Sequence, residues 1–530
     1  MTGPFRLRAL LDGVADLDLS ALPAGTLLDQ VEVAEVRDDS RKVQPGDLFV
    51  AVPGTQVDGR RFIADAAGRG ARVLVTEGPP PTVPFPGLVV RVGSARRALG
   101  VIAGNRFGAA RELDLIAVTG TNGKTTSTFL LEAILLAAGR SPGVIGTVSN
   151  RAAGWPGGAR PASLTTPGAL EINALFAEMR AVDTTDVVLE ATSQALEQGR
   201  LEACRFRVAG LTNVTQDHLD YHGSMERYFD AKAILFERLM RADGVGVFFV
   251  EQDEGRRMRA RMTGGTSGRT LGVALSPAAA ARAGGAAEVV VTSAVQTAEG
   301  WRLQLATPIG PIEVASPLVG GFNLSNLALV VGMAVAHGLG REAIAAGLAG
   351  LAGVPGRLQR VPNPRGVLCL VDYSHTPDAL ERAIAAVRPL TAGRVVVVFG
   401  CGGDRDRGKR PLMGEIVARD ADLAIVTSDN PRTEEPGSIL DMIVDGVRRQ
   451  GVPELDAAAL AAAARGYHRE VDRRAAIRRA AAACRAGDVL LIAGKGHEDY
   501  QILGTTKVHF DDREEASAAL AAVTASGANP

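Results

Sequence analysis

The sequence lacks the features that mark exported or membrane-bound proteins. Its four cysteines are scattered, and no paired spacing among them predicts a disulfide framework or a zinc site. No apolar run reaches the roughly 20 residues that span a bilayer, and the N-terminus carries no charged-then-apolar leader. We therefore expect a cytoplasmic protein that does not insert into a membrane.

The sequence also has almost no net charge and few aromatic residues. Lys and Arg number 58 against 59 Asp and Glu, and Phe, Trp and Tyr make up 4% of the chain. Without a surplus of positive charge, no global field recruits nucleic acid, so we expect no nucleic-acid partner. Hydrophobic residues at 46% over 530 positions instead predict a globular chain of about three domains.

The most informative stretch is an apolar run over residues 113–118 that ends in a glycine turn. Gly120 and Gly123 are followed by Lys124, and a helical pattern runs from residue 127 to residue 138. A strand, a glycine turn and a helix in this order aim backbone N–H groups and a helix N-terminus at a phosphate. A standard phosphate loop has a glycine five residues before Gly123, where this chain has Val118, so the loop is shorter at its front.

This turn predicts a nucleoside triphosphate site. Lys124 would supply a point charge between the terminal phosphates, and Thr125 a hydroxyl for the bridging Mg²⁺. Strands and helices alternate from residue 113 to about 351, which predicts a doubly wound α/β sheet. We expect residues 251–300 to form a peripheral insertion with weak strands.

Two polar residues follow strands of this sheet and complete a predicted magnesium site. Glu190 ends the strand at residues 186–189, and His218 follows the strand at residues 208–211. Ligands bind at the carboxyl edge of open parallel sheets, so both side chains should face the phosphate loop. Singly, Glu190 could be a structural cap and His218 a hydrogen-bonded surface residue; together they favour the functional interpretation.

Further α/β patterns precede and follow this region, which gives predicted domains at 1–110, 111–354 and 355–530. The first is a small mixed domain, with strands near 47–52, 73–76 and 88–92 and a helix at 62–67. The last has strands at 367–371, 394–399, 423–427 and 488–493, with helices at 377–386, 413–419, 438–449 and 473–483. The alanine-rich run at 456–465 predicts one more helix.

Each strand of the last domain leads into a polar loop, and four such loops on one edge predict a binding face. Arg405 and Arg432 are suited to clamp a carboxylate, because a guanidinium matches it in bidentate geometry. Glu498 could hold an ammonium, so the face would recognise a zwitterion. The other charges of the first loop could instead pair with one another on the surface; they are Asp406, Arg407, Lys409 and Arg410.

Six motifs together resemble the Mur ligase family, in the family's order from the first domain to the last. They lie at residues 119–126, 217–223, 321–326, 355–357, 372–378 and 429–432. The nearest likeness is to the branch that adds the third amino acid of the peptidoglycan precursor. The resemblance implies three domains: a small mixed α/β domain for the uridine nucleotide, a central phosphate-loop domain for ATP, and a Rossmann-like domain for the amino acid.

The resemblance also implies a reaction. ATP would phosphorylate the γ-carboxylate of UDP-N-acetylmuramoyl-L-alanyl-D-glutamate, and the amine of a diamino acid would attack the acyl phosphate. The implied cofactor is Mg²⁺, with ATP as co-substrate, and the implied partners are these small molecules; we expect a monomer.

Matching positions carry the family's site residues. The catalytic positions are Lys124, Glu190, His218 and Lys232, and the metal ligands are Thr125, Glu190, His218 and Lys232 as its carbamate. ATP-binding positions are Gly120, Thr121, Asn122, Gly123, Lys124, Thr125, Thr126, Asn323, Asn326, Arg357 and Asp372. Precursor-binding positions are Ser40, Thr55, Gln56, Val57, Thr165, Thr166, Thr192, Gln198 and Arg200. On the residues alone, Lys232 would be a helix-surface lysine.

Amino-acid-binding positions are Arg405, Asp429, Asn430, Pro431, Arg432, Gly494 and Glu498. The run at residues 429–432 resembles the version that takes meso-diaminopimelate, whose far carboxylate Arg432 would grip. Gln194 departs from the family, which commonly has histidine there.

Several rivals remain at this point. L-lysine or L-ornithine would set an ammonium against Arg432. A folylpolyglutamate synthase, a cyanophycin synthetase or an inactive nucleotide-binding scaffold is a more distant alternative.

Overall fold

The computed structural model describes residues 4–54, 57–80, 83–265 and 268–526. Internal contacts divide the chain into two compact units. The first comprises Met1–Val291, Leu305–Ile312 and Asn326–Gly347, and the second Thr292–Gln304, Glu313–Ser325 and Leu348–Pro530. Both units are mixed α/β with parallel strands, as predicted. The domain limits at residues 110 and 354 stay predictions.

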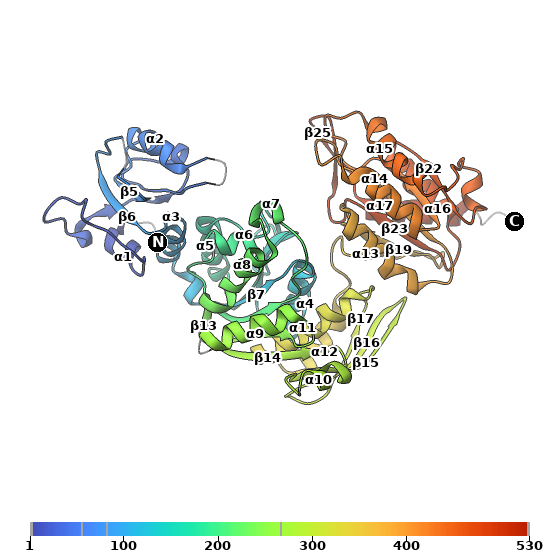
Figure 1. Cartoon of the computed structure of the whole chain (residues 1–530), viewed down its shortest axis with the longest axis horizontal. Helices are drawn as coiled ribbons and strands as arrows, with labels where there is room; N and C mark the ends of the chain where they lie inside the picture. The colour runs from blue at the N-terminus through green and yellow to red at the C-terminus, as the bar shows by residue number, and fades with distance from the viewer. Residues whose placement is uncertain (1–3, 55–56, 81–82, 266–267, 527–530) are drawn as a thin grey trace. The chain divides into compact units, whose positions relative to one another are not determined.

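The N-terminal part of the first unit is built on four parallel strands. Their order is β3 (Val36–Arg37), β4 (Leu48–Ala51), β5 (Val73–Glu77) and β6 (Leu88–Val92). Alternate residues face opposite sides, so Val50 packs with helix α3 (Ala95–Phe107), whereas Phe49 packs with helix α2 (Ile63–Gly68). The predicted small mixed domain is confirmed (Figure 1).

The central sheet places β7 (Asp114–Thr119) between β11 (Asp186–Glu190) and β12 (Phe206–Leu211), all parallel. Strand β8 (Pro142–Ile145) lies beyond β11, and β13 (Met240–Phe249) and β14 (Arg269–Ala274) lie beyond β12. The helices are α4 (Lys124–Ala137), α5 (Ala169–Arg180), α6 (Ser193–Glu197), α7 (Leu219–His222), α8 (Met225–Arg238), α9 (Asp253–Gly265), α10 (Pro277–Arg282), α11 (Phe322–His337) and α12 (Arg341–Gly350). Other elements of residues 1–354 are α1 (Leu7–Leu11), β1 (Phe5–Arg6), β2 (Glu32–Val33), β9 (Ser149–Ala152), β10 (Arg160–Pro161), β15 (Val289–Thr297), β16 (Gly300–Ala306) and β17 (Ile312–Ser316).

Two predictions for this region were wrong. Residues 251–300 are no peripheral insertion, because β14 pairs in parallel with β13 and so belongs to the central sheet. Its short, glycine-containing strand gives a weak local signal, and pairing with β13 supplies the hydrogen bonds. Helix α4 also begins three residues earlier than predicted, so Lys124 and Thr125 lie in its first turn.

The second unit contains a six-stranded sheet with the order β18 (Gln359–Val361), β19 (Leu368–Asp372), β23 (Val489–Ala493), β20 (Val395–Phe399), β21 (Leu423–Val426) and β22 (Gly466–Arg469). All neighbours are parallel except β18 and β19. Val397 packs with α13 (Pro377–Val387), α14 (Lys409–Asp420) and α15 (Pro436–Arg449). Val398, on the other face, packs with α16 (Arg473–Ala483) and α17 (Asp512–Ser526).

The Rossmann-like α/β arrangement predicted for the last domain is therefore confirmed (Figure 1). A hairpin of β24 (Tyr500–Leu503) and β25 (Thr506–His509) precedes α17. The hairpin and α17 were not predicted.

The predicted helix at residues 456–465 is wrong. The structure has only a short 3₁₀ turn at Ala459–Ala461. The Arg394 guanidinium donates hydrogen bonds to the carbonyl oxygens of Leu460, Ala461 and Ala463. A tertiary partner for these carbonyls outweighs the helix propensity of alanine.

Candidate active site

The phosphate loop connects β7 to α4 and depends on two glycines. Gly120 has φ +143° and Gly123 has φ +87°, backbone angles that residues with a side chain rarely adopt. A Cβ at Gly120 would collide with Thr212, and one at Gly123 would collide with Asn326. The N-cap residue of α4 is Gly123, which has no side chain to bond to the N–H groups of the first turn, so these groups can face an anion.

Strand β12 anchors this loop from the neighbouring position in the sheet. The Thr121 N–H donates to the carbonyl oxygen of Asn213 (2.9 Å), and the Asn122 N–H donates to its side-chain oxygen (3.0 Å). Thr212 Oγ1 donates to the Asn122 carbonyl at 2.6 Å. Lys124 Nζ folds back onto the carbonyl oxygens of Gly120 (2.9 Å) and Thr121 (2.8 Å). The loop is thus held in shape by the protein itself.

Glu190 lies beside the start of α4 and is 1% exposed. Thr125 Oγ1 donates to Glu190 Oε2 at 3.0 Å, and Thr147 donates to the same carboxylate through Oγ1 (3.1 Å) and its backbone N–H (2.8 Å). A Cβ at Gly146 would come within 2.5 Å of Glu190 Oε1, so the glycine leaves room for this side chain. Carboxylate and hydroxyl oxygens together fit Mg²⁺, a hard cation.

His218 lies outside this buried group. It caps α7 with φ 52°, and its side chain is 44% exposed. Its ring meets Tyr228 edge-on at 6.2 Å between centroids, and Tyr228 Oη lies 3.1 Å from Thr121 Oγ1. His218 therefore reaches the phosphate loop through Tyr228, a residue that the sequence did not indicate.

Lys232, on α8, is 1% exposed, so the residue-based interpretation of a surface lysine was wrong. Its Nζ donates to the Gly120 carbonyl at 3.1 Å and lies 4.2 Å from the centroid of the Tyr228 ring. Burial, with the nearby charge of Lys124, lowers the pKa of Lys232 well below its usual value. A lowered pKa favours the neutral form of this amine, which is the nucleophilic form.

The residues matched to the precursor's phosphates and peptide gather behind Glu190. Thr166 Oγ1 donates to the Glu190 carbonyl (2.7 Å) and lies 3.1 Å from Thr192 Oγ1. Arg200 Nη1 donates to the Thr166 carbonyl (2.7 Å), and Arg200 Nη2 donates to Gln198 Oε1 (2.7 Å). Thr165 Oγ1 lies 3.1 Å from Thr147 Oγ1.

The uridine-matched residues lie in the N-terminal part. Ser40 is buried and begins a 3₁₀ turn, and Val57 is 45% exposed. Thr55 and Gln56 lie outside the described residues.

Gln194, the departure from the family, touches Ser193, whose hydroxyl lies 3.4 Å from Gln194 Oε1. The same hydroxyl lies 2.9 Å from His222 Nε2. The structure thus pairs Ser193 with a buried histidine that sequence reasoning did not single out.

The nucleotide-matched residues are divided between the two units. Asn326 belongs to the first unit, against Gly123. In the second unit, Asn323 Nδ2 donates to the Val319 carbonyl at 2.7 Å, and the Leu358 N–H donates to Asp372 Oδ2 at 2.7 Å. The Arg357 guanidinium lies 5.5 Å from the centroid of the Tyr373 ring.

The amino-acid-matched loops converge at the carboxyl edge of the second sheet. Asn430 Nδ2 donates to Glu498 Oε2 at 2.9 Å, and Asn430 Oδ1 accepts from the Ile502 N–H at 3.0 Å. A Cβ at Gly494, where φ is +119°, would come within 2.5 Å of Asp429 Oδ2. The two loops are therefore in close contact.

Two arginines were predicted as carboxylate clamps on this edge. Arg432 follows Pro431, has φ 51°, and donates from Nη1 to the Gly403 carbonyl at 2.8 Å. Arg405 is exposed and donates to the carbonyl of Asp404 at 3.0 Å.

Lys495 was not predicted and lies inside the same loop cluster. It is buried, with Nζ 3.5 Å from Glu498 Oε2 and 3.4 Å from Asn430 Oδ1. Burial lowers the pKa of Lys495. A lysine at this position keeps Glu498 and Asn430 oriented toward each other. Its place beside two glycines in the sequence does not indicate that this lysine is buried.

The remaining charges near Arg405 have structural partners. Arg410 is 1% exposed and pairs with Glu434 through both Nη atoms, at 3.0 and 2.8 Å. Arg407 pairs with the same carboxylate at 3.2 Å, and Lys409 donates to the His375 carbonyl at 2.7 Å. Asp406 accepts from the Gly408 N–H at 2.8 Å. Pairing was the predicted alternative, but Glu434 was not the expected partner.

A second group of metal-type side chains lies at the other edge of the central sheet. Asp114, Asp186 and His337 offer ligand atoms within 4.8 Å of one another. Arginines already neutralise them, because Arg207 lies 2.8 Å from Asp114 and Arg140 lies 2.8 Å from Asp186. We therefore interpret this group as a structural ion-pair cluster.

No helix in the described part of the chain combines the length and the apolar character needed to cross a membrane. The glycine loop, the buried carboxylate at α4 and the second polar sheet edge together define a nucleotide-dependent phosphate-loop protein with two α/β bodies.

Comparison with known proteins narrows this class. Residues 32–106 match the model described as Mur ligase family, catalytic domain; residues 118–334 match the Mur ligase middle domain; residues 356–496 match the Mur ligase glutamate ligase domain. The chain belongs to the Mur ligase family.

Two curated relatives have the same name, UDP-N-acetylmuramoyl-L-alanyl-D-glutamate--2,6-diaminopimelate ligase. The protein of Gloeobacter violaceus is 46% identical over 499 residues, which cover 93% of this chain and 95% of that protein. The protein of Geobacter metallireducens is 43% identical over 505 residues, with 94% and 96% covered. A solved structure with this name has a TM-score of 0.70 at 30% identity and covers 98% of this chain and 99% of its own.

Proposed function

We propose that this chain is the ATP-dependent ligase that adds meso-2,6-diaminopimelate to UDP-N-acetylmuramoyl-L-alanyl-D-glutamate. The observation that carries the proposal is the loop cluster of the second unit, where Arg432 and Glu498 flank Asn430. The far end of diaminopimelate bears one carboxylate and one ammonium, and this cluster offers one side chain of each opposite charge. The two curated relatives support the same assignment.

The reaction has two steps. An oxygen of the D-glutamate γ-carboxylate attacks the γ-phosphorus of ATP, the bond to the β-phosphate oxygen breaks, and ADP leaves. The amine of diaminopimelate then attacks the carbonyl carbon of the acyl phosphate. The new C–N bond forms as phosphate leaves, and the nitrogen releases a proton.

The phosphate loop would bind and orient the triphosphate. The N–H groups of the first turn of α4 face the anion, and the two glycines let the backbone approach it. Lys124 Nζ now donates to two carbonyl oxygens. We infer that the phosphates replace one or both, because an ammonium binds an anion more strongly than a neutral carbonyl.

Thr125 and Glu190 would hold Mg²⁺, with His218 completing the site from the exposed side. When bound, Mg²⁺ offsets negative charge on the phosphoryl oxygens. Glu190 keeps its orientation through Thr147, which donates to it twice.

Lys232 would act as a carbamate. In its neutral form, which burial favours, the amine would attack CO₂, form an N–C bond and lose a proton, which turns it into a carboxylate-like oxygen ligand. Intact-mass measurement should show the added mass of CO₂ in wild type at high bicarbonate, and none in Lys232→Ala.

The precursor would lie along two groups of side chains. Thr165, Thr166, Thr192, Gln198 and Arg200 would meet its diphosphate and peptide, and Ser40 and Val57 its uridine end. The four cysteines are free and buried, which fits a reducing cytoplasm, the location we infer.

The test supplies purified protein with ATP, Mg²⁺, the UDP-dipeptide and one of diaminopimelate, L-lysine or L-ornithine. We expect ADP release and a UDP-tripeptide by mass spectrometry with diaminopimelate. Lysine and ornithine should react poorly, because their far end sets an ammonium against Arg432. If no diamino acid consumes the UDP-dipeptide, the proposed function is wrong; equal use of lysine would overturn only its specificity.

A further inference from the structure

A fully buried ion pair lies directly behind the amino-acid loops of the second unit. Arg473, the first residue of α16, and Asp512, the first residue of α17, both have side chains that are 0% exposed. Arg473 Nε donates to Asp512 Oδ1 and Nη2 donates to Asp512 Oδ2, each at 2.7 Å. This bidentate geometry fixes the plane of the guanidinium.

The other hydrogen bonds of Arg473 reach the two strands that lead into the loops. Nη1 donates to the carbonyl oxygen of Ser428 at 3.2 Å, and Nη2 donates to that of Ala493 at 3.0 Å. Ser428 immediately precedes the loop at residues 429–432, and Ala493 immediately precedes the loop at residues 494–498. One rigid side chain therefore holds the base of both loops.

The spacing between these loops decides whether their side chains meet. Asn430 and Glu498 are joined at 2.9 Å, and Asp429 fits against Gly494 only because that residue has no Cβ. Displacing one loop by a few tenths of an ångström would stretch the first contact toward the upper limit of hydrogen-bond length and would alter the second. The guanidinium of Arg473 spans the two strands and opposes such a displacement.

We propose that Arg473, held by Asp512, is a positioning residue for the incoming amino acid. It sets the separation of the two loops, and through them the binding of the diamino acid. The last helix thereby belongs to the construction of the substrate site, because Asp512 begins it. This inference rests on the proposed function, which assigns the two loops to the amino acid.

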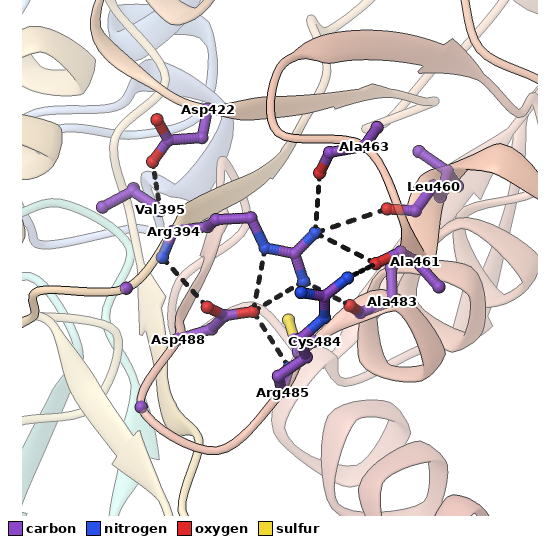
Figure 2. Close-up of polar contacts among 12 residues, drawn as sticks. Arg394, Val395, Asp422, Leu460, Ala461, Ala463, Ala483, Cys484, Arg485 and Asp488 are labelled. Carbon is purple, nitrogen blue, oxygen red and sulfur yellow. Dashed lines mark hydrogen bonds and ion pairs between the residues drawn. The ribbon is translucent and has the colours of Figure 1, made fainter.

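A general structural role is the rival explanation, and the same sheet offers a matched control. Arg394 and Asp488 form a second buried pair at the amino edge, with side chains 14% and 6% exposed and 2.8 Å between Nη2 and Oδ2 (Figure 2). This arginine donates to carbonyl oxygens of residues 460, 461, 463 and 483, none of which lies in a predicted substrate loop. Weakening the Arg394–Asp488 pair should lower stability and leave the geometry of the two substrate loops unchanged.

The experiment compares Arg473→Lys with Arg394→Lys in the full chain. Lysine keeps the charge but loses the bidentate fork and cannot hold both carbonyls. We expect Arg473→Lys to raise KM for diaminopimelate roughly tenfold, because small misplacements of binding groups have effects of this order. KM for ATP and for the UDP-dipeptide should change less than about twofold. Arg394→Lys should lower Tm and leave all three KM values within about twofold.

Asp512→Asn serves if Arg473→Lys does not fold, since it keeps the shape and one acceptor oxygen. It should raise KM for diaminopimelate in the same direction. The inference is overturned if no folded variant of the two, Arg473→Lys and Asp512→Asn, changes that KM more than Arg394→Lys does. Wild type that uses no diamino acid would instead overturn the proposed function. If wild type is active and Arg432→Lys raises KM for diaminopimelate while neither Arg473→Lys nor Asp512→Asn does, only the positioning role fails.

Discussion

Arg394 and Arg432, which lie at opposite edges of the sheet in the second unit, use their hydrogen-bond donors in opposite ways. At the amino edge, Arg394 donates to Asp488 and to four backbone carbonyl oxygens (Figure 2). At the carboxyl edge, the side-chain hydrogen bonds of Arg432 within the described part of the chain use only Nη1. A guanidinium offers five N–H donors, so Arg394 is saturated by the protein and Arg432 keeps donors for a ligand.

The central sheet repeats this contrast. At its amino edge, Asp114 faces Arg207 and Arg241, and Asp186 faces Arg140. At its carboxyl edge, Glu190 accepts hydrogen bonds from two hydroxyls and a backbone N–H. Charges balanced inside the protein stabilise the fold, whereas charges left to neutral partners can bind ions and anionic substrates.

Lys124→Ala tests the carboxyl edge of the central sheet and should have the largest effect. Removing the charge at the transferring phosphoryl group should lower the rate of ADP release about a thousandfold or more. The fold should survive, because Lys124 donates to loop carbonyls that water can also bind. Steady-state ADP release and Tm are the measurements.

Lys409→Ala is the control for Lys124→Ala, because it removes another half-buried lysine that donates to a carbonyl, that of His375. We expect its rate to stay near that of wild type. Turnover near the wild-type rate in Lys124→Ala would break the assignment of the phosphate loop.

Arg394→Ala tests the amino edge and should act on stability. Asp488 would keep a buried charge without its partner, and four carbonyl oxygens would lose a donor. We expect the free energy of unfolding to fall by about 3–5 kcal/mol. Urea denaturation provides the measurement. KM for diaminopimelate, measured where the variant is folded, should match wild type; a selective rise would contradict the division between the edges.

Local patterns predicted the strands and the loops, because apolar runs and glycine turns are properties of short segments. The strand at residues 88–92 and the helix at residues 473–483 have the predicted bounds. The convergence of loops 429–432 and 494–498 also followed from the rule that carboxyl ends of parallel strands share an edge.

Other features depended on partners distant in sequence. Lys232 is buried because Tyr228 and the Gly120 carbonyl enclose it, and no pattern in α8 signals that. Residues 456–465 fail to form a helix because Arg394 binds their carbonyls from more than 60 positions away. Charges gave the least information: sequence could not distinguish Arg394 and Arg410, which pair with carboxylates of the protein, from the clamp candidate Arg432.

Arg432→Ala sharpens the comparison at the carboxyl edge. Because the Arg432 side chain makes few hydrogen bonds with the protein, the free energy of unfolding should fall by less than about 1 kcal/mol. KM for diaminopimelate should rise roughly 10- to 100-fold, since a charge-assisted bidentate contact is lost. When diaminopimelate and L-lysine compete, the variant should prefer diaminopimelate over L-lysine less strongly than wild type does. An unchanged preference would remove Arg432 from the specificity of the site.

A substitution at His497 has the smallest expected effect. It tests whether burial at the carboxyl edge disfavours the protonated form of a histidine. Burial, with Arg357 nearby, lowers the pKa of His497 from 6.5 to about 4. Between these two pKa values the unfolded chain binds a proton that the folded chain does not, so stability falls as pH drops from 6.5 toward 4. We expect His497→Gln to remove roughly 1–2 kcal/mol of the stability difference between pH 7 and pH 5.

His509→Gln provides the control with the opposite sign. Hydrogen bonding to Glu514 raises the pKa of the exposed His509. Its contribution is complete below pH 6.5 and is lost as pH rises through the raised folded value, so the variant should lose stability on the acid side. Urea denaturation at several pH values separates the two histidines. If His497→Gln keeps the full acid sensitivity of wild type, the buried neutral histidine is not its source, and other groups of the carboxyl edge must take up the protons.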